Sequence, residues 1–152
     1  MKVSDNGRFF VGRGGKPFFY LADTAWALLY KPSLGEAEAY LRNRKEKGFT
    51  VIMPVLLWKE DTSPVNPDGE PPLIDWDPAR PNEAFFRHVD ALVDKAGELG
   101  LHMAMLPTWG EFVGPLFHRT KPRDGFVDRE IRTPVVERFD PDPAYVLVLE
   151  RR

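Results

Sequence analysis

Uninterrupted hydrophobic runs alternate with mixed polar segments along the chain, and this pattern predicts buried strands separated by helices. Apolar runs at residues 18–22, 51–57 and 101–106 are typical of strands that are covered on both faces. A shorter run at residues 8–11 precedes a glycine-rich turn at 12–17. Because glycine supplies the backbone angles of tight turns, these two segments predict a short β-hairpin ahead of the first buried strand.

Two amphipathic segments between these runs predict helices. Ser33 and Glu36 have the spacing of a capping box, and Gly48 is a typical stop for the helix that follows. The second helix is predicted to begin near Asn82. Its apolar positions recur every three or four residues, at Phe85, Val89, Leu92, Ala96 and Leu99. His88 lies off this stripe, so its side chain is expected to face solvent.

The order strand, helix, strand, helix, strand predicts a parallel sheet with right-handed crossovers. Pro54 interrupts the second run and predicts a bulge or an unpaired position, since proline cannot donate a ladder hydrogen bond. The long connection 58–81 is rich in Pro, Asp and Gly, which is typical of functional or disordered loops. Residues 145–149 are apolar enough for a fourth strand.

Charge density divides the chain near residue 118. Residues 119–152 carry 15 charged side chains in 34 positions, whereas the 118 residues before them carry 29. We therefore predict two segments. Residues 1–117 form the folded N-terminal part of an α/β domain, and residues 118–152 form a charged, divergent tail with the fourth strand.

Composition excludes several classes of protein. At 152 residues the chain is too short for a complete (β/α)8 barrel, which needs about 250. The lack of cysteine rules out disulfides, thiolate metal sites and cysteine nucleophiles. A net charge of −2 without a basic stripe argues against nucleic acid, and the apolar runs are far shorter than a membrane span. No secretory signal starts the chain, so a cytoplasmic location is the default expectation. With no histidine pair at metal-ligand spacing and no phosphate loop, we expect no metal and no other cofactor.

Candidate binding residues follow the predicted strands, because ligands of parallel α/β sheets bind at the carboxyl ends of strands. Flat tryptophan faces stack on sugar rings, and carboxylates accept hydrogen bonds from sugar hydroxyls. The residues predicted to bind sugar in this way are Asp23, Thr24, Trp26, Trp58, Thr108, Trp109 and Glu111. No single one is decisive, and their common position after strands is what points to a carbohydrate site.

Each of these candidates also has a structural explanation. Asp23 suits the N-cap of a short helical turn through Trp26, and any of the tryptophans suits a half-buried core position. Glu111 suits a solvated loop position. His102 lies inside the third predicted strand and is expected to be a structural histidine. Residues 66–70 match a calcium loop only faintly, because the loop contains a proline and too few acids.

Taken together, these segments resemble the start of the apiosidase-like glycoside hydrolases. The most specific matches are Asp-Thr-Ala-Trp at residues 23–26 and Pro-Thr-Trp-Gly at residues 107–110, each directly after a predicted strand. Further similar segments lie at residues 3–19, 36–41, 47–52, 81–86 and 88–106. The resemblance covers residues 3–117 and fades beyond them.

The resemblance implies a fold and an activity. The fold is a partial (β/α)8 barrel of the first three to four βα units, and the activity is hydrolysis of plant cell-wall polysaccharides, including apiose-containing pectic side chains. Thr50 and Met53 stand where this family usually has Asn and Gln. The family's Gly-Gly-Asp acid segment after the fourth strand is not present here. Glu150 is the only acid near that position, which makes it the candidate catalytic residue.

These observations predict a carbohydrate-active protein whose partner is an oligosaccharide or polysaccharide. Because the family's acid segment and later nucleophile strand are missing, we expect the 152-residue chain to be truncated and inactive alone. The alternative is a non-catalytic sugar-binding remnant that needs another chain to complete the barrel. An uncovered barrel edge also favours self-association, because its backbone groups lack partners.

Overall fold

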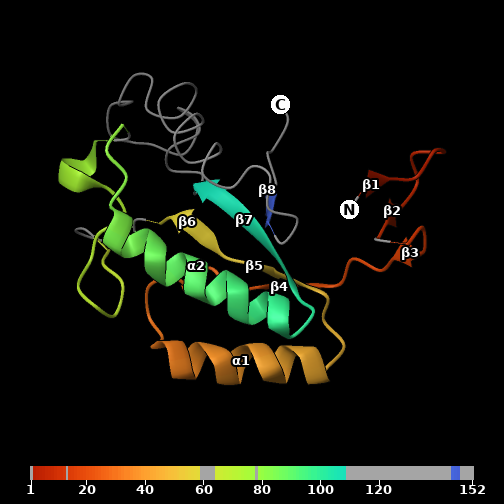
Figure 1. The fold of residues 1–152 in the computed structure, drawn as a ribbon, viewed down its shortest axis with the longest axis horizontal. Coiled ribbons are helices and arrows are strands. Elements are labelled where there is room, and N and C mark those ends of the chain that lie inside the picture. The colour runs from red at the N-terminus through yellow and green to blue at the C-terminus, as the bar shows by residue number, and fades with distance from the viewer. Residues whose placement is uncertain (1, 13, 59–63, 78, 109–144, 148–152) are drawn as a thin grey trace, which may run out of the picture.

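Two sheets and two helices make up the part of the chain that the structure describes (Figure 1). The structure is a computed structural model, and it describes residues 2–12, 14–58, 64–77, 79–108 and 145–147. The larger sheet is parallel throughout, and the smaller one is antiparallel and lies at the end where the parallel strands begin.

In the parallel sheet β4 pairs with β5, and the strands β5, β6 and β8 all pair with β7. Its strands are β4 (Ala22–Thr24), β5 (Val51–Met53), β6 (Val55–Leu57), β7 (His102–Thr108) and β8 (Tyr145–Leu147). β5 and β6 both pair with β7, so they are two halves of one strand that is interrupted at Pro54. The predicted irregularity at Pro54 is therefore confirmed. Its carbonyl oxygen still accepts from the Leu106 amide at 2.9 Å, which keeps the two halves in register with β7.

The apolar run at residues 18–22 does not form one buried strand, and that prediction is wrong. Its start belongs to the antiparallel sheet of β1 (Lys2–Val3), β2 (Phe10–Val11) and β3 (Pro17–Phe18), and its end belongs to β4. Phe19 lies between the two sheets and is 73% exposed. The chain is held there by Thr50, whose hydroxyl donates to the Phe19 carbonyl at 2.6 Å and accepts from the Leu21 amide at 3.0 Å.

The predicted hairpin is present, with β1 as a further strand on its outer side. β2 and β3 pair across the glycine-rich turn, and no pattern in the sequence indicated β1. The Phe18 ring stands edge-on to the His102 ring with 5.0 Å between centroids. Since His102 is the first residue of β7, this contact places the small sheet at the amino ends of the parallel strands.

Both helices begin where the sequence predicted. α1 (Leu34–Glu46) has the complete capping box of Ser33 and Glu36, and α2 (Glu83–Glu98) is capped by the Asn82 side chain. A single 3-10 turn, η1 (Ile74–Trp76), lies in the long connection before α2. The two helices pack against each other and against the sheet, and the core lies between these layers. No helix in the described ranges is long and apolar enough to span a membrane.

His88 is buried, not solvent-facing as predicted, and only 5% of it is exposed. The buried face of α2 is wider than the single stripe seen in the sequence, because Phe86 and Val93 are buried as well. The Asp68 carboxylate, in the long connection, is near enough to the imidazole to act on its charge, so this connection lies on the His88 side of the helix. The apolar pattern alone assigns every helix position off the stripe to solvent, whereas in the fold the long connection lies on this side of α2.

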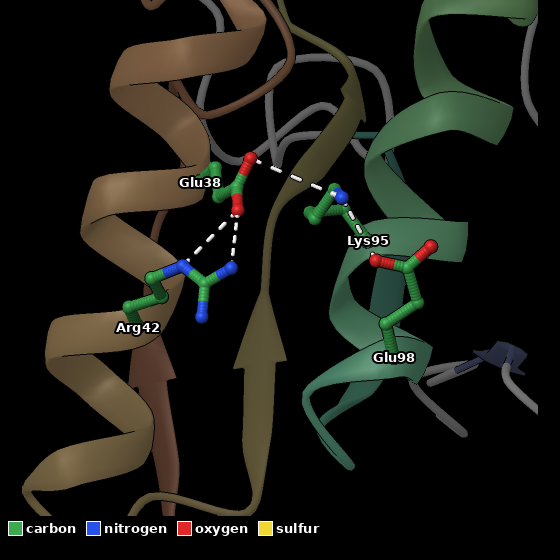
Figure 2. Close-up of polar contacts among 4 residues, drawn as sticks. All are labelled: Glu38, Arg42, Lys95 and Glu98. Carbon is green, nitrogen blue, oxygen red and sulfur yellow. Dashed lines mark hydrogen bonds and ion pairs between the residues drawn. The ribbon is translucent and has the colours of Figure 1, made fainter.

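Charged side chains link α1 to α2 on the outside of the helix pair (Figure 2). Glu38 accepts from Arg42 one turn later, and its Oε2 lies 3.9 Å from the Lys95 Nζ on α2. Lys95 also pairs with Glu98 at 2.8 Å. The bond from Arg42 lowers the pKa of Glu38, and the bond to Glu98 raises the pKa of Lys95. Such exposed pairs contribute little to stability, so apolar packing holds the helices together.

Candidate functional site

The carboxyl ends of the parallel strands bring several of the predicted site residues to one side of the sheet. Asp23 and Thr24 close β4, Trp58 directly follows β6, and Thr108 is the last residue of β7. The arrowheads of β6 and β7 point toward this side, and η1 lies on it as well (Figure 1). Trp109, Glu111 and Glu150 lie outside the described residues, so their predicted roles stay predictions.

A hollow of about 430 Å³ opens beside the end of β4. It is lined by the last residues of β4, the segment that follows them and the inner side of α1: Asp23, Thr24, Ala25, Trp26, Ala27, Leu28, Lys31, Pro32, Tyr40 and Arg44. Trp26 is 44% exposed, which leaves much of its indole accessible at the hollow. Thr24 is also exposed. The hollow therefore offers an aromatic face and a hydroxyl, which are groups suited to a sugar ring.

The Asp23 carboxylate is held by α1. Its Oδ2 accepts from the Tyr40 hydroxyl at 2.6 Å and lies 3.1 Å from an Arg44 guanidinium nitrogen. The guanidinium in turn lies over the rings of Tyr40 and Phe49, at 5.0 and 5.7 Å from their centroids. Burial, followed by the hydrogen bond to Asp23, raises the pKa of Tyr40, so its hydroxyl remains a donor at physiological pH. Asp23 thus uses its oxygen to join β4 to α1 instead of capping the turn that follows.

Trp58 lies in the core and is not among the residues that line the hollow. It is 9% exposed and stands edge-on to the Tyr30 ring with 5.9 Å between centroids. Its amide donates to the Tyr30 hydroxyl at 3.3 Å, and that hydroxyl donates to the Leu56 carbonyl. The Lys31 ammonium lies 5.1 Å from the indole centroid. This burial favours the structural explanation of Trp58 over the sugar-binding one.

The long connection is an ordered loop in its described part. Asn66 accepts with its side-chain oxygen from the Asp68 and Glu70 amides, which closes a turn at the faint calcium-loop match. Its side chain therefore shapes the loop rather than facing an ion. Among the described residues, no cluster of three or more acids or histidines is placed to hold a metal. The prediction of no metal stays a prediction for the whole chain.

Two residues of η1 have an unusual backbone that sequence reasoning missed. Asp75 and Trp76 have φ values of 55° and 56°, a region that glycine normally occupies. The Arg80 side chain pairs with the Asp75 carboxylate at 2.6 Å, and the Ile74 amide donates to the Arg80 carbonyl at 2.9 Å. These bonds hold the conformation. Trp76 packs against the core from the carboxyl side of the sheet, and nothing in its sequence context distinguishes it.

Acidification is expected to destabilise the protein through His88. Burial lowers the pKa of His88 below its ordinary value of 6.5, and its buried Nε2 has no hydrogen-bond partner among the residues that the structure describes. The unfolded chain therefore binds a proton first, so stability is complete above pH 6.5 and falls as the pH drops toward the lowered folded pKa. Urea unfolding between pH 7 and 5 should show this loss, and His88→Gln should flatten it. An equal slope in both proteins would contradict the assignment.

Comparison with known proteins identifies the family. The model of the apiosidase-like catalytic domain matches residues 4–149. The chain belongs to this family. The match extends past residue 117, where the motif resemblance in the sequence fades. The recognition made from the two strand-end motifs, of an apiosidase-like glycoside hydrolase family, is confirmed. No curated protein matches the chain.

Solved structures give the fold. A glycoside hydrolase is 25% identical with a TM-score of 0.75, and the match covers 95% of this chain and 32% of that one. A glycoside hydrolase family 5 structure from Bacteroides vulgatus ATCC 8482 is 22% identical with a TM-score of 0.74, covering 95% and 31%. An exo-beta-1,4-mannosidase from Opitutaceae bacterium strain TAV5 is 18% identical with a TM-score of 0.53, covering 70% and 18%.

The apiosidase-like chain therefore has the fold of part of a (β/α)8 barrel, preceded by a short antiparallel sheet, as predicted. It spans about a third of the length of the first two structures. β4, the β5–β6 strand, β7 and β8 are its parallel strands in the described ranges, and α1 and α2 are the crossover helices between the first three.

Proposed function

We propose that this apiosidase-like chain binds plant cell-wall polysaccharide, of the pectic class, at the carboxyl side of its parallel sheet. The observation that carries the proposal is the hollow beside β4, in which the family motif at residues 23–26 presents an exposed indole and a hydroxyl. Trp26 would stack on a sugar ring, and Thr24 would bond a ring hydroxyl. Thr108, Trp109 and Glu111 are proposed to extend the same surface, with Glu150 as the candidate acid.

Replacing Trp26 should weaken binding without unfolding the protein. An aromatic face contributes ~0.5–1.5 kcal/mol beyond its area, so Trp26→Ala should weaken pectin binding about threefold to tenfold. Retardation in native gels that contain pectin measures this, with dextran gels as the reference. Phe19→Ala is the matched control, since Phe19 is an exposed aromatic at the other end of the parallel strands. The proposal would be wrong if pectin retarded wild type, Trp26→Ala and Phe19→Ala equally, or if it retarded none of them.

A non-catalytic binding role is the second candidate, and one observation favours it. Asp23 is the acid at the end of β4, and its carboxylate is occupied by Tyr40 and Arg44. Glycoside hydrolysis needs two carboxyl groups on either side of the scissile bond. In the described ranges no second carboxylate lines the hollow with Asp23. The proposal therefore places binding, and not turnover, in the described part of the chain.

We also propose that the chain self-associates through the edge of β4. The Val51 amide donates to the Leu21 carbonyl, and the Ala25 amide donates to the Met53 carbonyl. Because the backbone groups of successive strand residues alternate in direction, the amide and carbonyl of Ala22 point away from β5. An edge that has no partner strand among the described residues pairs readily with another strand. Light scattering should detect oligomers, and Ala22→Pro should reduce them, because proline removes the outward amide and leaves the β5 ladder intact. A monodisperse wild-type monomer would refute this.

A further inference from the structure

The side chain of Asp23 points to the opposite face of β4 from Thr24. Successive side chains of a strand alternate between its faces, and Asp23 contacts Tyr40 and Arg44 on α1. Both contacts fall on the same oxygen of Asp23, and the side chains of Asp23 and Arg44 are each 26% exposed. The carboxylate thus lies between strand and helix, at the side of the hollow that it lines with Tyr40 and Arg44.

Backbone hydrogen bonds also hold the end of β4. β4 has only three residues and pairs with β5 on one side, which makes it the edge of the sheet in the described ranges. Beyond it, the Ala25 amide donates to the Met53 carbonyl at 3.0 Å, and the Trp26 carbonyl accepts from the Val55 amide at 3.3 Å. These two bonds and the contacts of Asp23 fix the path of the backbone that carries Trp26.

The restraint from α1 is itself rigid. The Arg44 guanidinium lies over the Tyr40 and Phe49 rings, and these contacts help to hold it beside Asp23. α1 is anchored at its start by the capping box and along its length by the buried Ala37 and Leu41. Because α1 is held in place, Tyr40 and Arg44 keep Asp23 in a fixed position, in the way that supporting residues hold a binding group in place.

We infer that Asp23 acts in sugar binding as a positioning residue, which fixes Thr24 and Trp26 through its contacts with Tyr40 and Arg44. The inference rests on the proposed function of the hollow. It assigns Tyr40 and Arg44 to the binding machinery as supporting groups, a role that no motif in the sequence indicated. Asp23, which the sequence predicted to bind sugar, is thereby assigned a supporting role.

A double-mutant cycle separates support from contact. Tyr40→Phe removes one bond to Asp23 but leaves the carboxylate, and Asp23→Leu removes both acceptor oxygens in a side chain of similar shape. If Asp23 acts through Tyr40, each variant weakens pectin binding about fivefold and the double variant is no worse than Asp23→Leu. If Asp23 contacts sugar directly, Tyr40→Phe binds like wild type, which overturns the inference.

Hydrogen exchange supplies a readout that needs no sugar. The Ala25 amide should exchange about tenfold faster in Tyr40→Phe and Asp23→Leu, because β4 loses its hold on α1. The Leu106 amide, which donates to Pro54 on the far side of β5, is the internal control and should not change. Unchanged exchange at Ala25 overturns the inference even if binding falls, since Tyr40 then acts by touching the sugar. If the wild-type protein does not bind pectin, the proposed function is wrong. The hydrogen-exchange result would still test whether Tyr40 and Asp23 hold β4 against α1.

Discussion

Trp58→Ala should lower the free energy of unfolding by about 3–5 kcal/mol, the range for removing a large buried aromatic from a core. Trp58 is 9% exposed and packs on Tyr30, which belongs to the same core cluster. The substitution leaves a cavity beneath the end of β6 and removes the ring that lies beside the Lys31 ammonium. Urea or thermal unfolding followed by circular dichroism measures the loss.

Two variants make this result specific. Trp58→Phe keeps an aromatic ring at the site and should be destabilised far less than Trp58→Ala. Trp26→Ala removes the same side chain from an exposed position and should leave the unfolding midpoint nearly unchanged. A Trp58→Ala protein that is as stable as wild type but binds pectin poorly would return Trp58 to the sugar site. Trp26 and Trp58 would then both bind sugar, although one is exposed and the other is buried.

Local signals in the sequence predicted the elements well. The Ser33–Glu36 capping box and the Asn82 cap act within four residues, so no distant contact alters them. Pro54 breaks its strand for an equally local reason, the missing amide. The strand-end motifs identified the family because they combine a local pattern with a fixed place in the fold. These are the parts of the structure that short-range chemistry determines.

Tertiary contacts determined what the sequence did not give. The run at residues 18–22 is divided between two sheets because Thr50, far along the chain, binds its middle. His88 is buried although it lies off the apolar stripe, and the Asp68 carboxylate of the long connection lies near it. Asp23 was recognised at the correct strand end, but periodicity alone does not say that Tyr40 and Arg44 occupy its carboxylate. Each of these outcomes depends on which distant group packs against the residue.

The 152-residue chain is expected to bind pectin without hydrolysing it. Retaining chemistry needs two carboxyl groups about 5–5.5 Å apart, and inverting chemistry about 6.5–9.5 Å, with one of them protonated. On the carboxyl side of the described sheet, Asp23 is ion-paired with Arg44, and Asp75 is ion-paired with Arg80. Each of these carboxylates is already engaged by an arginine, whereas the reaction needs two carboxyl groups that flank the scissile bond.

Glu150 is the remaining candidate, and its sequence context argues in the same direction. It is followed by Arg151 and Arg152, whose charges favour an ionised carboxylate over the acid that protonates a leaving group. Incubation of the purified chain with aryl glycosides and pectin fragments should therefore release no product above the buffer rate, while native gels with pectin still retard it. Turnover that persists through repurification and disappears in Glu150→Gln would reverse this conclusion and make Glu150 the general acid. Turnover that is equal in wild type and Glu150→Gln would instead direct attention to Glu111, the predicted acid after β7.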